Sequence, residues 1–271
     1  MAISFYSSSL TDNAAGRLLE VLDSMFSGHA YWSKYDDEAN GMTANEAVYR
    51  CYDPYGVTHF YIYVKNNYTG YAEIECWESW DNVTHAGSGN RLYYGWSNTS
   101  YLLRIYYSAS TWYACVTDFN FHLNFNNAHN FIGRPDYVVD PGRNMVVLLT
   151  RGTSTTEFDP FSYGYRAAAN SYIVAKIWDM NNSEIGIFDG LEAYLLDQGA
   201  VYTSIDTVEF DPKTWISDQN RSIIGYIENG VSCWKWEKIL VSGDTVTVNG
   251  QTWIYLYALG GDDHGSLMRI S

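Results

Sequence analysis

Residues 57–78 read VTHFYIYVKNNYTGYAEIECWE and alternate apolar with polar side chains on both sides of a short polar turn. The residues that share the apolar face are Phe60, Ile62, Val64, Ala72, Ile74 and Cys76. Alternation with a period of two is typical of strands that bury one face against a core. The residues NNYTG between the two runs suit a hairpin turn, so the segment predicts two neighbouring antiparallel strands.

The same alternation recurs along most of the chain. Asn249-Gly250 joins two such runs, and this dipeptide is a strong hairpin signal. Within 119–125, His122 alternates with apolar positions and is expected on a polar surface. The predicted fold is mainly β, with antiparallel β-sandwich or barrel-like sheets. Further strands are expected at 101–107, 112–117, 119–125, 145–150, 171–178, 184–188, 201–210, 223–228, 231–236, 245–248 and 252–259.

One α-helix is predicted near the N-terminus, where apolar residues recur at helical spacing. Asp12 or Asn13 is the expected N-cap, and Gly28 ends the helix. The apolar stripe of this helix comprises Leu18, Leu22, Met25 and Phe26. Two interpretations of the stripe remain open: it closes one end of the sheet core, or it is an assembly interface that docks on a neighbouring subunit.

Composition predicts loops and one boundary. Residues 31–45 are polar and 85–90 are glycine-rich, so both are expected to be surface loops. Residues 151–161 are rich in Ser, Thr, Gly and Pro and mark the preferred boundary. The chain then divides into 1–150, the helix plus a first β region, and 151–271, a second β region. One continuous domain is the alternative.

Charge and hydropathy limit the partners and the compartment. The 31 acidic and 16 basic residues give a formal charge of −15, which disfavours nucleic acid and anionic membranes as partners. The N-terminus lacks a basic stretch followed by an apolar core, so no secretory signal is expected. No window approaches the roughly 18 apolar residues of a transmembrane helix. These features predict synthesis in the cytoplasm.

The four cysteines are Cys51, Cys76, Cys115 and Cys233. Metal sites usually bring cysteines in close pairs, and these four lie far apart. The last three fall inside strand-like runs, where a free cysteine behaves as a small buried hydrophobe. They therefore predict a role in the core.

Few residues suggest catalysis. Asp81 and His85 could act as acid and base, but no nucleophile accompanies them. Asp262-Asp263-His264 follows two glycines and is more typical of a solvated turn than of a metal site. A sugar-cleaving groove needs two opposed carboxylates, and exposed glutamates on a sheet face explain Glu73, Glu75 and Glu78 equally well. We therefore expect a protein that is not an enzyme, with no cofactor and no bound metal.

Aromatic residues make up 17% of the chain, with 25 tyrosines and 10 tryptophans. Tyr and Trp combine a large contact area with a polar group, and they are enriched where proteins meet proteins or stack on sugar rings. The composition favours a protein that works through interfaces. The alternative is a carbohydrate-binding β-sandwich or receptor-binding module, in which the residues that stack on sugars would be Trp77, Trp80, Trp96 and Trp112.

Several stretches together resemble structural proteins of tailed bacteriophages, from the tail, baseplate or neck. These are FYIYV at 60–64 with IECWESWD at 74–81, YLLRI at 101–105 with FIGRP at 131–135, YIVAK at 172–176, and the hairpin 246–257 followed by SLMRI at 266–270. The resemblance implies a virion component made in the host cytoplasm, with no catalytic residues. It also implies that the partners are other virion proteins and copies of the chain itself in a symmetric assembly.

Overall fold

The computed structural model describes residues 3–92, 103–125, 128–134, 137–138, 145–149, 176–179, 184–187, 214–217, 223–227, 232–235, 241–248, 250–257 and 264–271. This part of the chain is mainly β, and its strands pair antiparallel. Its helical elements are α1 (Arg17–Phe26) and the 3-10 turn η1 (Glu38–Asn40). The predicted class, antiparallel sheets with one N-terminal helix, is confirmed for these residues.

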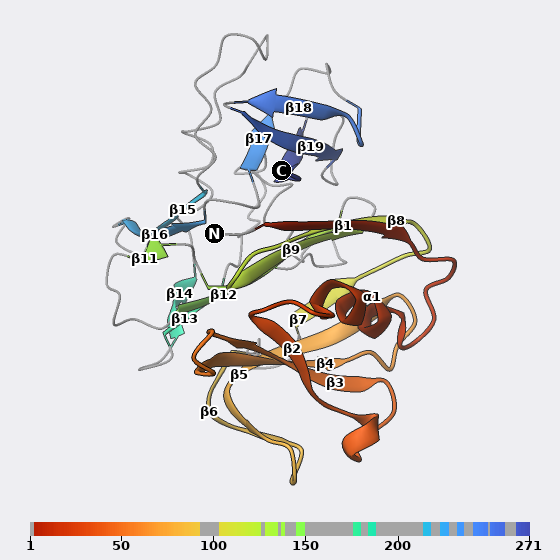
Figure 1. The fold of residues 1–271 in the computed structure, drawn as a ribbon, viewed down its shortest axis with the longest axis vertical. Helices are drawn as coiled ribbons and strands as arrows, with labels where there is room; N and C mark the ends of the chain where they lie inside the picture. The colour runs from red at the N-terminus through yellow and green to blue at the C-terminus, as the bar shows by residue number, and fades with distance from the viewer. Residues whose placement is uncertain are drawn as a thin grey trace.

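The described strands form four sheets, three of which stack as layers in Figure 1. The N-terminal sheet contains, in spatial order, β2 (Trp32–Asp37), β3 (Glu46–Tyr52), β4 (Thr58–Lys65), β5 (Tyr71–Asp81) and β6 (Ala86–Leu92), with β7 (Leu103–Tyr106) paired to the first half of β5. The central sheet contains β1 (Ser4–Ser9), β8 (Thr111–Val116), β9 (Asn120–Phe125), β10 (Ala128–Gly133), β12 (Met145–Leu149), β13 (Lys176–Asp179) and β14 (Glu184–Ile187). The C-terminal sheet contains β17 (Ser232–Lys235), β20 (His264–Arg269), β19 (Gln251–Tyr257) and β18 (Thr245–Val248). The small fourth sheet contains β11 (Tyr137–Val138), β16 (Ile223–Ile227) and β15 (Thr214–Ser217).

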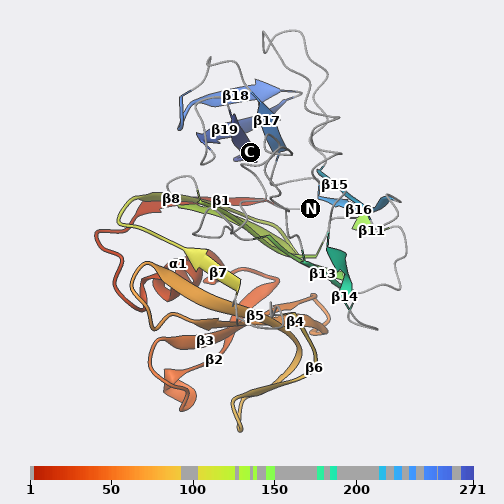
Figure 2. The same ribbon diagram turned by 180° about the vertical axis from the view of Figure 1, so that it is seen from behind.

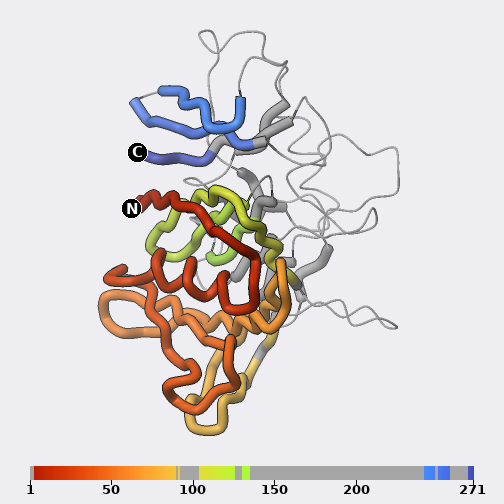
Figure 3. The backbone as a smooth tube through the Cα atoms, turned by 90° about the vertical axis from the view of Figure 1, so that its right-hand side faces the viewer, coloured from red at the N-terminus to blue at the C-terminus, as the bar shows by residue number. Residues whose placement is uncertain are grey.

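The main core lies between the N-terminal sheet and the central sheet. Figure 3 shows α1 between these two layers, and Figure 2 shows the same order of layers from behind. Each large side chain buried here stabilises the fold by roughly 1.5–3 kcal/mol, so the inward aromatic residues of both sheets dominate this core. They include Trp32, Tyr49, Phe60, Phe121 and Phe125.

A second, smaller core joins the central sheet to the C-terminal sheet. It comprises Cys115, Ile254, Leu256 and Met268, with Ile3, Phe5, Tyr113 and Ile270 packed against them. β8 contributes to both cores, because Ala114 and Val116 face the main core and Cys115 faces the second. The central sheet therefore packs against another layer on each of its two faces.

Burial on both faces corrects one expectation from the sequence. All the residues of β9 are buried, and His122 is only 1% exposed. The prediction that His122 lies on a polar surface is therefore wrong. The strands predicted at 112–117, 119–125 and 245–248 are confirmed as β8, β9 and β18.

α1 packs its apolar stripe into the main core. Leu18, Leu22, Met25 and Phe26 are at most 3% exposed, and the ring of Phe26 stacks on Trp32 with centroids 4.8 Å apart. The stripe therefore closes the core of its own chain, which is the first of the two interpretations. The second interpretation, an assembly interface on the helix, is wrong because these four side chains are buried.

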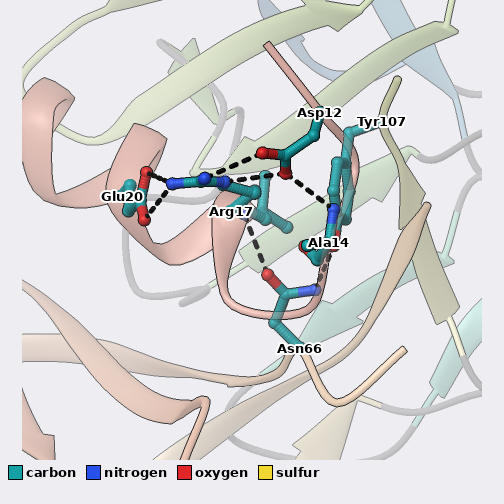
Figure 4. A network of polar contacts seen from close by, with 7 residues as sticks. Asp12, Ala14, Arg17, Glu20, Asn66 and Tyr107 are labelled. Carbon is teal, nitrogen blue, oxygen red and sulfur yellow. Dashed lines mark hydrogen bonds and ion pairs between the residues drawn. The ribbon is translucent and has the colours of Figure 1, made fainter. Parts of the chain in front are cut away.

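The start of α1 is capped from a distance. The N-cap residue is Gly16, with φ of 89°. The prediction that Asp12 or Asn13 caps the helix is therefore wrong. Figure 4 shows Asn66, from the turn between β4 and β5, whose Oδ1 accepts the backbone N–H of Leu18 at 2.9 Å. At the other end the prediction holds, since Gly28 follows the helix with φ of 73°.

Two predicted loops contain strands. Residues 32–37 form β2, an edge strand that buries Trp32 and is otherwise largely polar, so its alternation is weak. Residues 86–92 form β6, whose Gly87 lies so close to Trp77 that a Cβ would clash with the indole. An edge strand with mostly polar residues lacks clear alternation, and so does a strand in which glycines pack against a neighbour. Neither strand could therefore be predicted from alternation.

Some predictions concern other parts of the chain. Outside the described residues lie the predicted boundary at 151–161, the predicted strand at 201–210, Trp96, and Asp262-Asp263. The division into 1–150 and 151–271 accordingly stays a prediction.

Candidate functional site: the outward face of the N-terminal sheet

The face of the N-terminal sheet that points away from α1 carries a row of cross-strand neighbours. Ser33 pairs with Arg50, Arg50 with Tyr61, Tyr61 with Trp77, and Trp77 with Arg91. The row, which we call the outward row, therefore crosses β2 to β6. With strands spaced by about 4.8 Å, it is about 19 Å long. Directly opposed side chains on one face contact each other, so the row forms one continuous strip.

Arg50 is held in place by its neighbours. Its Nε donates to Ser33 Oγ at 3.0 Å, and its guanidinium carbon lies 5.2 Å from the ring centroid of Tyr35 and 4.8 Å from that of Tyr52. Each cation–π contact contributes roughly 0.5–1 kcal/mol at an exposed site. Among the described residues Arg50 makes no ion pair. The guanidinium is thus oriented without a carboxylate partner.

Trp77 and Arg91, at the other end of the row, are already paired. The Trp77 indole N–H donates to Glu75 Oε2 at 3.0 Å, and the Arg91 guanidinium lies 4.9 Å from the Trp77 ring centroid. Arg91 also forms an ion pair with Glu75, with Nε 3.1 Å from Oε2. Because Gly87 supports the indole from β6, the ring is half-buried and fixed.

Beyond this row lie two carboxylates that are partly or fully withdrawn from solvent. Glu73 is 8% exposed and lies 3.8 Å from Arg104, and burial raises the pKa of its carboxyl group. Tyr63 donates its hydroxyl to Glu46 Oε2 at 2.7 Å, and burial, followed by this bond, raises the pKa of the phenol. The expectation of exposed glutamates is therefore wrong for Glu73.

The sheet has two irregularities near this face. The register shifts between Lys34 and Asp36, where the extra residue lies on β2, and between Trp77 and Ser79, where the extra residue lies on the partner strand β6. An extra residue reverses the face to which the following side chains point. The extra residue of β2 places Asp36 opposite Val48 on the outward face. Trp80 packs there against Met42 and Val48 in a small cluster separate from the main core, and its ring stacks on Tyr63 at 5.3 Å. 

Asp36 joins the β5–β6 hairpin to β2. The side chain is 0% exposed, and its Oδ2 accepts the Trp80 indole N–H at 2.8 Å and lies 2.9 Å from His85 Nδ1. Oδ1 is buried without a hydrogen-bond partner among the described residues. His85 has φ of 52°, a conformation that non-glycine residues rarely adopt. The carboxylate thus fixes the far end of the hairpin.

The Asp81–His85 pair considered from the sequence is not what the structure brings together. Asp81 Oδ1 accepts the backbone N–H groups of Val83 at 2.8 Å and Thr84 at 3.3 Å, which lowers the pKa of its carboxyl group. His85 bonds to Asp36 instead. Asp81 therefore shapes the turn between β5 and β6, and Asp36 is the residue that sequence reasoning missed.

The tryptophans named for glycan stacking have different positions. Trp77 is half-buried on the outward row, whereas Trp80 is 8% exposed and Trp112 is 3% exposed. Trp112 faces the main core with Ala114 and Val116, because alternate residues of β8 point to that side. The prediction that Trp80 and Trp112 stack on sugars is therefore wrong, because both rings are buried. Trp96 lies outside the described residues.

Arg50, Tyr35 and Tyr52 were not identified from the sequence. Residues 46–52 read EAVYRCY, a strand signal that was not recognised beside the polar segment before it. Tyr35 reaches this face through the irregularity in β2, which periodicity does not reveal. The strand that carries Arg50 could have been predicted from residues 46–52. The face on which Tyr35 lies could not, because it depends on the irregularity in β2.

Within the described ranges, no cluster of three or more His, Cys, Asp and Glu side chains is placed to hold a metal ion. No helix in that part of the chain is long and apolar enough to cross a membrane. No protein-family model matches the chain, and no curated protein matches it in sequence.

Proposed function

We propose that this chain is a non-enzymatic structural component of a tailed-phage virion, in the tail, baseplate or neck. It acts by protein–protein assembly with copies of itself in a symmetric arrangement and with other virion proteins. The phage context comes from the resemblance of the quoted sequence stretches. The observation that carries the assembly role is the outward row. There Arg50, which makes no ion pair within the described part of the chain, lies among half-buried tyrosines and a tryptophan.

The composition of this face supports a protein partner. Tyr, Trp and Arg are the residue types that most often carry the binding energy of protein interfaces. Their rings and guanidinium groups are held by their neighbours here: Tyr35 packs edge-on against Tyr61 with centroids 5.1 Å apart, and Arg91 is fixed by Glu75. Side chains that are already ordered lose little conformational entropy on binding.

A second candidate function, glycan or receptor binding, is supported by Trp77. It is the one of the three described tryptophan candidates that is not buried, and it adjoins Tyr61 in register. Adjacent rings on a sheet face can stack on successive sugar units. The two arginines of the row, Arg50 and Arg91, also suit an interface between proteins, which is why assembly is the first candidate.

The test is the mass of the purified chain in solution, measured by sedimentation velocity over a range of concentrations. We expect a discrete oligomer, and we expect Tyr61→Ala to reduce its mass because the centre of the row is lost. Tyr55→Ala is the matched control, since Tyr55 is a tyrosine that is 91% exposed outside the row. A wild-type monomer at every concentration would overturn self-assembly. A monomer that binds glycans and loses them on Trp77→Ala would establish the second candidate instead.

A further inference from the structure

Arg50 differs from the other arginines of its face. Arg91 is paired with Glu75 and Arg104 with Glu73, whereas Arg50 makes no ion pair among the described residues. A guanidinium without an ion-pair partner binds a carboxylate well, because the N–H groups of its planar fork donate to the two carboxylate oxygens. On a chain with a formal charge of −15, a second copy is rich in carboxylates.

One exposed segment of the chain has the complementary character. The β5–β6 hairpin projects from the body of the molecule in Figure 1. We call residues 81–84, the last residue of β5 and the first three of the turn, the hairpin tip. Val83 is 82% exposed at its end, and Asp81 is exposed beside it. The tip therefore offers an apolar side chain next to a carboxylate.

The hairpin tip is also held in one conformation. Asp81 organises the turn through the N–H groups of Val83 and Thr84, and these bonds keep its carboxyl group ionised by lowering its pKa. Asp36 fastens the base of the tip through Trp80 and His85. A projecting segment that is already ordered binds with a smaller entropic penalty than a flexible one.

We infer that the hairpin tip of one copy docks on the outward row of the next, with Asp81 against Arg50 and Val83 against Tyr35 and Tyr52. The inference rests on the proposed function and names the surface of the partner. The tip and the row are different surfaces of one chain, so the contact is head-to-tail. Repetition of such a contact forms a ring when the rotation closes, which suits a symmetric assembly.

The test uses Arg50→Ala and Asp81→Asn in the full chain, with sedimentation velocity as the measurement. Asparagine keeps the oxygen that accepts the turn N–H groups, so Asp81→Asn removes the charge without removing the turn. Each variant alone should associate at least about tenfold more weakly than the wild type. Val83→Ser is a second variant of the tip, and Lys65→Ala is the matched control, which removes one positive charge elsewhere on the same face.

Mixing the two variants separates a head-to-tail contact from other arrangements. The Asp81→Asn copy keeps an intact row and the Arg50→Ala copy keeps an intact tip, so one good contact can form in each mixed pair. We expect dimers in the mixture and nothing larger. No association in the mixture, or wild-type association of Arg50→Ala and Asp81→Asn alone, would overturn the inference while leaving self-assembly standing. A monomeric wild type would overturn the proposed self-assembly as well.

Discussion

The backbone N–H of Leu18 donates to Oδ1 of Asn66 at 2.9 Å, across 48 residues of sequence. The Asn66 amide also donates to the Tyr107 hydroxyl at 2.7 Å and to the Tyr71 carbonyl at 3.2 Å, and the side chain is 0% exposed. One amide therefore joins the start of α1 to β5 and to the segment after β7. The helix depends on a contact that its own sequence does not supply.

Asn66→Ala should lower the free energy of unfolding by about 2–3 kcal/mol, because a helix cap is lost and buried polar groups lose their partner. Urea unfolding followed by circular dichroism measures this change. Asn67→Ala is the control, since its side chain makes a part-buried bond to Glu46 and should cost less than about 1 kcal/mol. Equal effects of the two substitutions would contradict the role of Asn66.

Acid should remove the stability contributed by the hydrogen bonds between Asp12 and Arg17 at the start of α1. The bidentate hydrogen bonds of Arg17, together with the N–H of Ala14, lower the pKa of Asp12 from 3.8 to about 2. A depressed pKa in the folded state adds stability above the unfolded pKa and loses it as the pH falls toward the folded value. The stability difference between the wild type and Asp12→Asn should therefore be full above about pH 4 and vanish near pH 2. A difference that does not change across this window would rule out the network as its source.

The bond between Asp36 and Trp80 should appear as coupling between the two side chains. Asp36→Ala leaves a buried indole N–H without its acceptor, which costs about 1–3 kcal/mol, whereas Trp80→Phe removes the donor itself. The double variant should therefore be more stable than the sum of the two effects predicts, by about 1–2 kcal/mol. Urea unfolding of the four proteins gives this value, and strict additivity would show that the bond contributes nothing.

Three thiols should be protected in the folded chain. Cys51, Cys76 and Cys115 are buried, and burial raises the pKa of the Cys51 and Cys76 thiols above the usual range. A thiol reacts as the thiolate, so both exposure and ionisation are unfavourable here. Iodoacetamide at neutral pH should label these three only after unfolding, as mass spectrometry of the peptides will show. Rapid labelling of any of them in the native protein would contradict the described core.

Gly87→Ala should disturb the outward row directly. A methyl group at this position would overlap the Trp77 indole, and such overpacking costs about 1–3 kcal/mol. The near-ultraviolet circular dichroism of the tryptophans should change as well. Ser88→Ala, at the neighbouring position, should stay within about 0.5 kcal/mol of the wild type. If Gly87→Ala behaved like this control, Trp77 would not lie against β6.

The sequence predicts the parts of this fold that alternate against a single core. The β4–β5 hairpin was expected because its apolar face meets only the main core and its other face is polar. β9 was expected as a strand, but its polar residues are buried too, since two layers cover the central sheet. A pattern of apolar and polar residues cannot distinguish water from a second layer that accepts Asn and His side chains.

The site was less predictable for a geometric reason. Trp77 was named from composition, and its position in β5 follows from alternation. Asp36 reaches this face because an extra residue shifts the register of β2, and Trp80 donates to it there although plain alternation along β5 would point Trp80 to the main core. One inserted residue reverses every later side chain, and no local propensity fixes where that residue falls.

The position of β1 has a consequence for how the chain is made. β1 pairs with β8, and the hydroxyls of Ser9 and Thr111 lie 3.2 Å apart across 102 residues of sequence. A ribosome adds roughly 5–20 residues per second, so the first strand waits roughly 5–20 s for its partner to emerge. During that time its unpaired edge is open to other nascent chains on the same message. Polysomes that carry this protein are therefore the place where its misassembly would begin.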